Sequence, residues 1–191
     1  MNINQATIDL VKRWEGFKAE AYVCPAGVLT IGYGTTSRAG IGVTVRPGMR
    51  TSEAEAEQWL RKGLERFASQ IRPAITAPIN DNEFGAFLSL AYNIGPNGFK
   101  GSSALRHFNA GDKAKAAAAI KLWNKATVNG KRQVMRGLVN RREDEVRLFL
   151  TPVTRSAPPV NETAKPEHGG LGIATAIAAL IAAVAAWIGF S

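Results

Sequence analysis

Residues 14–34 read WEGFKAEAYVCPAGVLTIGYG, and this stretch indicates the fold class. The apolar residues that lead up to Glu15 follow helical spacing, and Gly16 is typical of a helix end. From residue 21 to residue 45, β-branched and aromatic residues broken by glycine predict a small antiparallel sheet with a turn at residues 25–27. A short helix that leads into a small sheet, followed by a long helical region, predicts an α+β protein that is mainly α.

Helical spacing resumes after this sheet and continues to about residue 150. Ser52 followed by Glu55 matches a capping box, and the helix that they start is predicted to end near Ile71, before Pro73. Further helices are predicted from Asn80-Asp81 onward and over residues 102–109, 112–126 and 134–150, with Gly111 and Gly130 in the connections.

The composition is that of an ordinary folded protein of 191 residues, with 46% hydrophobic and 20% charged residues. The single cysteine, Cys24, excludes an internal disulfide. His107 and His168 are far apart, and no Cys/His cluster has metal-ligand spacing, so we expect neither a metal nor a cofactor. One domain of about 150 residues with an appendage is the natural expectation.

The net charge is +9, and its whole excess lies in residues 1–150 because the four charges beyond residue 150 cancel. Such an excess favours a polyanionic partner through long-range attraction. Nucleic acid, anionic lipid and bacterial cell wall all fit, and solubility alone is an equally good explanation.

The last 41 residues differ in composition from the domain. Residues 151–170 hold four prolines and are interpreted as a semi-extended linker. Residues 171–190 are a 20-residue apolar run without a charge, long enough to span a bilayer as a single hydrophobic helix. Membrane association is the preferred interpretation, and an alanine-rich helix packed on the domain is the alternative.

The N-terminus, MNINQATIDLVKRWEG, is amphipathic and lacks the apolar region of a secretion signal. We therefore expect the chain to be made and retained in the cytoplasm unless a separate protein opens a route.

A carboxyl group at position 15 is expected to have unusual surroundings. The negative end of the helix dipole lies at the C-terminus of a helix, and it disfavours a carboxylate there. Trp14 and Phe17 on either side can add desolvation. A glutamate held protonated near neutral pH is what a general acid requires, although most glutamates at helix ends are solvated surface charges.

The spacing Glu15, eight residues, Cys24, five residues, Thr30 within LTIGYG resembles the active-site signature of phage-type lysozymes, glycoside hydrolase family 24. Four later stretches resemble further motifs of that family in the right order, so that the resemblance covers about residues 4–150. They are TSEAEAEQWL, INDNEFGAFLSLAYNIG, GFKGSSALRHFNAGD, and a tryptophan followed by GKRQVMRGLVNRREDEVRLFL.

The resemblance implies a two-lobed fold in which a small β-hairpin lobe faces a helical lobe across a cleft. It also implies cleavage of the β-1,4 bond between N-acetylmuramic acid and N-acetylglucosamine in bacterial peptidoglycan. The family's three catalytic positions match Glu15, Cys24 and Thr30. Glu15 is expected to protonate the leaving oxygen, and Thr30 to position a water or steady the second group.

The second catalytic position is usually an aspartate, although some similar phage endolysins carry cysteine there. A thiol with a pKa of about 8.5 is a few per cent thiolate at pH 7, but it is intrinsically nucleophilic. Cys24 could attack the anomeric carbon, which would retain the configuration there. Alternatively, Cys24 and Thr30 together could activate a water, which would invert the configuration, as is usual in the family. An inert apolar filler is the third interpretation.

Other positions carry weaker expectations from the same resemblance. Thr35 stands where the family often places a histidine. The sequence suggests Arg141, Arg142 and Glu145 as ion pairs that hold the fold or as surface charge. Sugar contacts are expected from Tyr33, Tyr92, Asn93 and Ser103, with Ser102 a similar candidate.

The leading hypothesis is an endolysin that degrades the periplasmic wall of a bacterial host and depends on a separate holin for access. The main alternative is a non-catalytic wall-binding or membrane-active protein on a lysozyme fold. A nucleic-acid-binding protein ranks last, because no motif with interleaved aromatic and basic residues supports it.

Overall fold

The computed structural model describes residues 1–128 and 130–153, which belong to one compact unit. The predicted linker and apolar run, residues 151–170 and 171–190, lie outside the described residues except for 151–153. Among the described helices, none has the length and apolar character needed to cross a membrane.

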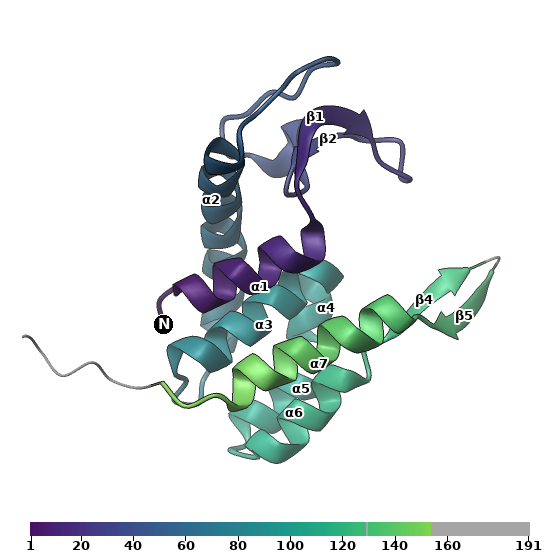
Figure 1. The fold of residues 1–191 in the computed structure, drawn as a ribbon. Coiled ribbons are helices and arrows are strands. Elements are labelled where there is room, and N and C mark those ends of the chain that lie inside the picture. The colour runs from purple at the N-terminus through teal and green to yellow at the C-terminus, as the bar shows by residue number, and fades with distance from the viewer. Residues whose placement is uncertain (129, 154–191) are drawn as a thin grey trace, which may run out of the picture. The chain divides into compact units, whose positions relative to one another are not determined.

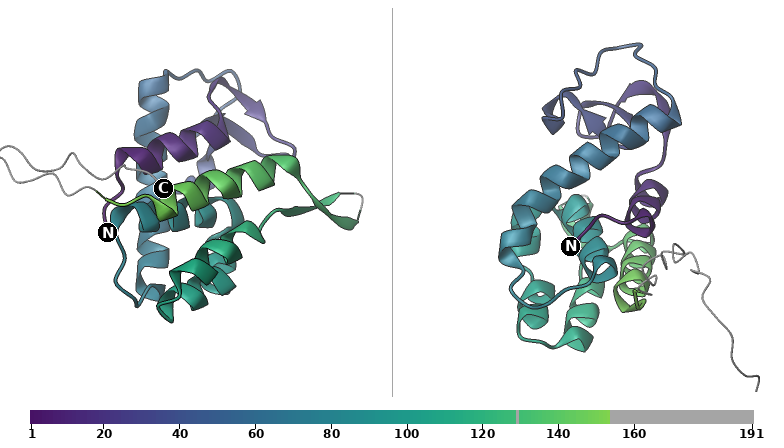
Figure 2. Two further views of the ribbon diagram at one scale, coloured as in Figure 1. Left: turned by 60° about the horizontal axis from the view of Figure 1, so that its bottom comes forward. Right: turned by 90° about the vertical axis from the view of Figure 1, so that its left-hand side faces the viewer.

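The unit has a small β lobe and a larger helical lobe, joined by one long helix (Figure 1). The β lobe is a three-stranded antiparallel sheet of β1 (Lys18–Val23), β2 (Leu29–Gly32) and β3 (Thr35–Thr36), followed by the short 3-10 helix η1 (Ser37–Ala39). The long helix α2 (Glu53–Ile71) runs from this lobe to the helical one (Figure 2). The two-lobed α+β fold, mainly α, that is expected from the sequence is confirmed.

The helical lobe packs its helices around α3. It contains α1 (Gln5–Glu15), η2 (Arg72–Ala74), α3 (Asp81–Ile94), α4 (Pro96–Lys100), α5 (Ser103–Asn109), α6 (Lys113–Lys121) and α7 (Arg136–Leu150), and a hairpin of β4 (Lys125–Val128) and β5 (Lys131–Val134) precedes α7.

The core of the helical lobe is aromatic at its centre. The ring of Phe87, on α3, lies 5.1 Å from the rings of both Phe99 and Phe108 and 5.3 Å from that of Phe149. These rings come from α3, α4, α5 and α7, so one cluster fixes four helices. A separate small cluster of Ile31, Val45 and Trp59 fixes the β lobe on α2.

Local signals explain the helix ends. The Asn4 side chain accepts the backbone N–H of Thr7 at the start of α1, and Gly16 ends α1 with φ 68°. Ser52 accepts the backbone N–H of Glu55 at the start of α2 as predicted, but the Glu55 carboxylate accepts from the Thr51 hydroxyl at 2.8 Å instead. The full capping box lies at the start of α3 instead.

Three sequence predictions are wrong in detail. The sheet ends at Thr36, and residues 41–45 form no strand, although Val45 packs against Trp59 in the small cluster of the β lobe. The helix predicted over 112–126 ends at Lys121, and the chain then forms β4. The helix predicted from 134 begins at Arg136, because residues 131–134 pair with β4.

Candidate functional site

A cleft of about 500 Å³ lies between the β lobe and the helical lobe. Its walls come from the end of α1, the turn after β2, β3, η1, the C-terminal part of α2, and the adjoining ends of α3 and α4. The residues that line it are Glu15, Gly34, Thr36, Arg38, Ala39, Arg66, Phe67, Gln70, Tyr92 and Pro96. Within the described part of the chain, Glu15 supplies the only carboxyl group that lines the cleft.

Glu15 is positioned by the end of α1 and by an arginine from α7. Its Oε1 accepts a hydrogen bond from Arg141 Nη1 at 2.9 Å, and its side chain is 22% exposed. A Cβ added at Gly34 would lie 3.8 Å from Glu15 Oε2, so the second oxygen faces the turn of the β lobe. Arg141 thus fixes one carboxyl oxygen and leaves the other toward the cleft. The sequence spacing gave no sign of this contact.

The arginine that holds Glu15 belongs to a buried ionic cluster. Arg141 Nε lies 3.3 Å from Glu145 Oε1, and Arg142 Nε lies 2.7 Å from Glu145 Oε2. The Ser89 hydroxyl donates to Glu145 at 2.8 Å. Burial raises the pKa of Glu145, which the two arginines oppose, and burial lowers the pKa of Arg142. The expectation of ion pairs that hold the fold is confirmed for these three residues, and that of surface charge is wrong.

Thr30 lies on β2, on the face that looks toward the cleft. It is directly opposite Tyr22 on β1 and Thr36 on β3. Residues directly opposite each other in an antiparallel pair project from the same face, and Thr36 lines the cleft. The Thr30 hydroxyl donates a hydrogen bond to the backbone carbonyl of Val28 at 2.9 Å. Its oxygen lone pairs therefore remain available to accept a hydrogen bond.

Cys24 lies at the turn between β1 and β2, where the chain forms a tight hydrogen-bonded loop. Its backbone N–H donates to Val28 O at 2.9 Å, and the Gly27 N–H donates to Cys24 O at 2.8 Å. The thiol is a free one and is half-buried. The backbone N–H groups of Val28 and Ala26, and the Thr30 hydroxyl, lower the pKa of Cys24. The structure thus brings Cys24 and Thr30 together.

Glu15 belongs to the other side of this arrangement. It shares the cleft with Thr36, the cross-strand neighbour of Thr30, whereas neither Cys24 nor Thr30 is among the residues that line the cleft, and Thr30 is buried. The three positions singled out in the sequence therefore divide into a carboxyl group in the cleft and a thiol and hydroxyl in the β lobe, the thiol at the β1–β2 turn and the hydroxyl on β2.

The four expected sugar contacts have different surroundings. Tyr92 lines the cleft, its hydroxyl donates to Tyr33 O at 3.4 Å, and burial raises its pKa. Tyr33 is 3% exposed, donates to Glu53 at 2.7 Å and packs under the Lys12 ammonium, which places its side chain in the packing between the lobes. Asn93 and Ser103 do not line the cleft.

Ser102, the further candidate, is 2% exposed and caps α5 by accepting the Leu105 N–H.

Four polar residues of the cleft were missed in the sequence. Thr36 comes from β3, Arg38 from η1, and Arg66 and Gln70 from α2. Arg66 Nη1 donates to Gly40 O at 2.7 Å and so holds the loop after η1. Residues 66 and 70 are four apart in a predicted helix, so their common face could have been found from the spacing.

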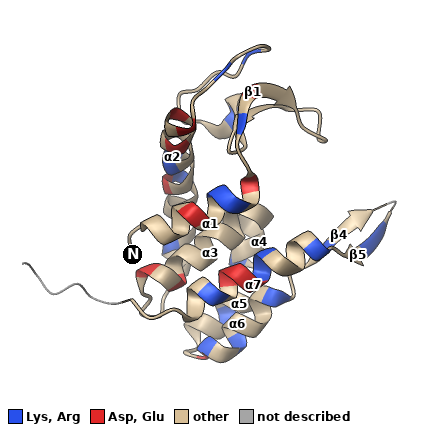
Figure 3. Ribbon diagram, viewed as in Figure 1, with Lys and Arg blue, Asp and Glu red and all other residues tan. Residues whose placement is uncertain are grey.

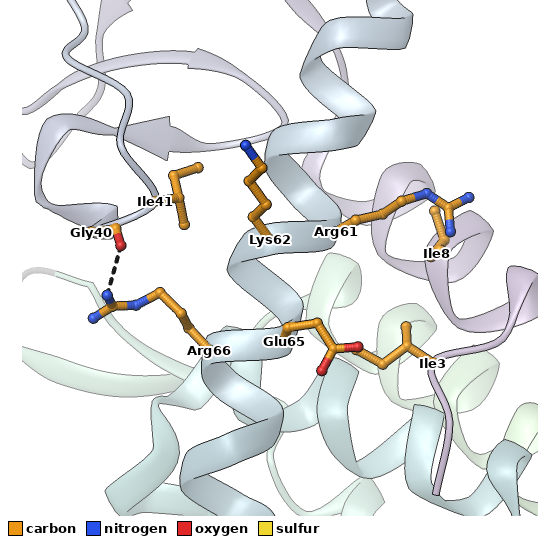
Figure 4. A pocket seen from close by; sticks show the side chains of 8 residues that line it. All are labelled: Ile3, Ile8, Gly40, Ile41, Arg61, Lys62, Glu65 and Arg66. Atoms are coloured by element: carbon orange, nitrogen blue, oxygen red, sulfur yellow. Dashed lines mark hydrogen bonds between the residues drawn. The ribbon is translucent and has the colours of Figure 1, made fainter.

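A second hollow of about 660 Å³ lies between α2, residues 40–41 and the N-terminal segment (Figure 4). Its single carboxyl group, that of Glu65, is ion-paired with Arg72 at 3.4 Å. Glu15 is not among the residues that line it, whereas Glu15 lines the cleft, so we assign the chemistry to the cleft. The residues that line it are Ile3, Ile8, Gly40, Ile41, Arg61, Lys62, Glu65 and Arg66.

Comparisons with known proteins identify similar chains. The sequence profile of the phage lysozyme family matches residues 12–145. An endolysin of Acyrthosiphon pisum secondary endosymbiont phage 1 is 37% identical over 149 residues, which cover 78% of this chain and 98% of that relative. An endolysin of Bacillus phage B103 is 38% identical over 87% of this chain, which spans 60% of that relative's length.

A solved endolysin from Escherichia coli O157:H7 phage FAHEc1 has a TM-score of 0.72 to this chain at 38% identity. The similarity covers 82% of this chain and 98% of that structure. The match to the family profile runs from α1 into α7 and includes the positions of Glu15, Cys24 and Thr30.

Proposed function

The chain belongs to the phage lysozyme family, and we propose that it is an endolysin that hydrolyses the β-1,4 bond between N-acetylmuramic acid and N-acetylglucosamine. One observation carries the proposal: a glutamate lines an interlobe cleft, and the β lobe that forms the other wall carries a thiol with a lowered pKa beside a threonine hydroxyl. A non-catalytic wall-binding protein, the alternative, would need no such thiol.

Glu15 supplies the proton in this proposal. Its cleft-facing Oε2 protonates the glycosidic oxygen, and the C–O bond to the muramic acid then breaks. The carboxylate that remains is paired with Arg141, whose cationic group is already 2.9 Å from Oε1. The pair therefore both orients the acid and stabilises the charge that it acquires.

Cys24 and Thr30 prepare the attacking water. The Thr30 hydroxyl donates a hydrogen bond to Val28 O, so its oxygen can accept a hydrogen bond from the water. The Cys24 thiolate accepts the proton that the water loses as its oxygen bonds to the anomeric carbon. This route inverts the configuration, whereas direct attack by Cys24 Sγ would retain it.

The test is the loss of turbidity of bacterial cell walls with four proteins: wild type, Glu15→Gln, Cys24→Ser and Cys24→Asp. We expect the rate of turbidity loss to fall by at least about 100-fold in Glu15→Gln and in Cys24→Ser. Cys24→Asp should keep substantial activity, because a carboxylate also accepts a proton. Equal clearing by wild type and Glu15→Gln would contradict the enzyme proposal. Full activity of Cys24→Ser would show that Cys24 is a spectator.

A further part of the proposal concerns residues 171–190, an apolar run without a charged residue. We propose that this run associates with the inner membrane of the host, and that a separate holin gives the domain access to the periplasmic wall. The measurement is membrane fractionation of the full chain and of a chain without residues 169–191. An identical soluble distribution of both would contradict the membrane association.

A further inference from the structure

The net charge of the chain is confined to one segment. Residues 113–142 contain nine Lys and Arg residues and no Asp or Glu. The remaining residues contain fifteen basic and fifteen acidic side chains, since the whole chain has 24 and 15. The excess of +9 therefore arises entirely from α6, the β4–β5 hairpin and the first half of α7.

Five of these nine cations have no carboxylate partner in the described part of the chain, and all five are exposed. The other four are engaged in ion pairs with Glu83, Asp112, Glu15 and Glu145. The five unpaired cations lie in residues 121–136, which we call the basic arm; they are Lys121, Lys125, Lys131, Arg132 and Arg136.

The hairpin of the basic arm projects from the helical lobe (Figures 1 and 2). All four residues of β5 are exposed. Lys125 is directly opposite Val134, and Thr127 is directly opposite Arg132, so these four side chains share one face of the hairpin. Ala126, on the opposite face, lines a hollow beside Trp14 on the body of the domain. The face with Lys125 and Arg132 is therefore turned away from that hollow.

Large apolar side chains are exposed among these cations. Leu122 is 68% exposed and Val134 is 58% exposed, and Val128 and Met135 are each 37% exposed. The acidic residues lie elsewhere, with several at the end of α2 that adjoins the β lobe (Figure 3). None of the described residues of the basic arm, 121–128 and 130–136, lines the cleft.

We propose that the basic arm binds the surface of a bilayer that contains anionic phospholipid. Clustered Lys and Arg attract anionic headgroups, and exposed apolar side chains between them enter the boundary between headgroups and acyl chains. An anionic polysaccharide would be held by the cations alone and gives no role to Leu122 and Val134. The arm would hold the domain at the membrane surface with the catalytic cleft free.

The test is cosedimentation of the full-length chain with two kinds of vesicle, neutral phosphatidylcholine and an equal mixture of phosphatidylcholine and phosphatidylglycerol. The arm variant carries Lys125→Gln, Lys131→Gln and Arg132→Gln. A matched control variant, Lys18→Gln, Arg46→Gln and Lys100→Gln, loses the same charge from exposed positions outside the arm. Every protein carries the same residues 171–190, so this run contributes equally.

We expect wild type to prefer the anionic vesicles. The arm variant should lose about 100-fold in partitioning onto them, because each cation at the surface contributes about fivefold, and the control variant should lose much less. Leu122→Ser with Val134→Ser should weaken binding without changing its salt dependence.

Three results would overturn the proposal. The first is equal partitioning of wild type onto both kinds of vesicle. The second is an equal loss by the arm and control variants, which would show that net charge alone is responsible. The third is an arm variant that keeps its vesicle binding but loses binding to purified peptidoglycan, which would assign the arm to the wall.

Discussion

Arg141 connects the cleft to the core at the scale of single residues. Its guanidinium contacts Glu15 on one side and Glu145 on the other, so the proposed acid is held by a group that is 4% exposed. The spacing of Glu15, Cys24 and Thr30 could be found in the sequence, because the three positions are close along the chain. The contact with Arg141 could not, because it joins residues 126 positions apart through the packing of α1 on α7.

Alkylation measures the protonation state of the Cys24 thiol directly. Because neighbouring N–H groups and the Thr30 hydroxyl lower the pKa of Cys24, its thiolate is present at lower pH than that of an ordinary cysteine. We expect the rate of iodoacetamide labelling against pH to have its midpoint below about 8.5, and Thr30→Val to move the midpoint upward. Activity should fall as the pH falls through the same midpoint and should be lost on labelling.

A midpoint at or above 8.5, or one that Thr30→Val leaves unchanged, would show that the neighbours do not act on the thiol. Full activity of the labelled protein would contradict the proposed role of Cys24.

Glu145 is expected to be the most costly charge to remove. Arg142 is 1% exposed and pairs with Glu145 at 2.7 Å, so Glu145→Gln leaves a buried cation without its partner. The free energy of unfolding should fall by about 3–5 kcal/mol in urea denaturation. Glu143→Gln, the same change at an exposed position of α7, should cost less than about 0.5 kcal/mol. Equal effects of the two changes would contradict the importance of the buried pair.

At the scale of elements, the ends of α1 and α2 were predicted correctly, because their signals are local. Gly16 marked the end of α1, and Pro73 marked the end of α2. The β4–β5 hairpin was missed because the alanine-rich spacing of α6 continues into residues 122–126. The sequence Asn129-Gly130, which is typical of two-residue hairpin turns, was the signal that could have found it.

The contact between α1 and α3 depends on a glycine. A Cβ at Gly85 would collide with Thr7 Oγ1, which itself donates a hydrogen bond to Asn4 Oδ1 at 2.8 Å. We expect Gly85→Ala to lower the free energy of unfolding by about 1–3 kcal/mol despite the higher helix propensity of alanine. The double variant Gly85→Ala with Thr7→Ala should recover part of the loss in thermal or urea unfolding.

Gly63→Ala on α2 is the matched control, since nothing lies within 4 Å of a Cβ there. It should stabilise the protein by up to about 1 kcal/mol. If Gly85→Ala were as favourable as Gly63→Ala, α1 and α3 would not be as closely packed as the structure has them.

At the scale of the whole molecule, two lobes joined by α2 form the cleft, and the charged residues are unevenly distributed over the elements. Lys12 on α1 pairs with Glu57 at 2.8 Å and Glu53 at 3.1 Å on α2, which ties the acid-bearing helix to the connecting helix. The net positive charge lies in α6, the basic arm and α7 instead. The sequence predicted the overall excess and the two-lobed fold, but the projection of the basic arm depends on a hairpin that sequence reasoning missed.

The most direct test of the central claim is the identity of the sugar at the new reducing end. Purified peptidoglycan would be digested with wild type, with Glu15→Gln as the control, and then reduced with borohydride and hydrolysed to amino sugars. Hydrolysis after N-acetylmuramic acid predicts muramitol with wild type and none above background with Glu15→Gln. Glucosaminitol, or a 1,6-anhydromuramic acid product that has no reducing end, would contradict the proposed reaction.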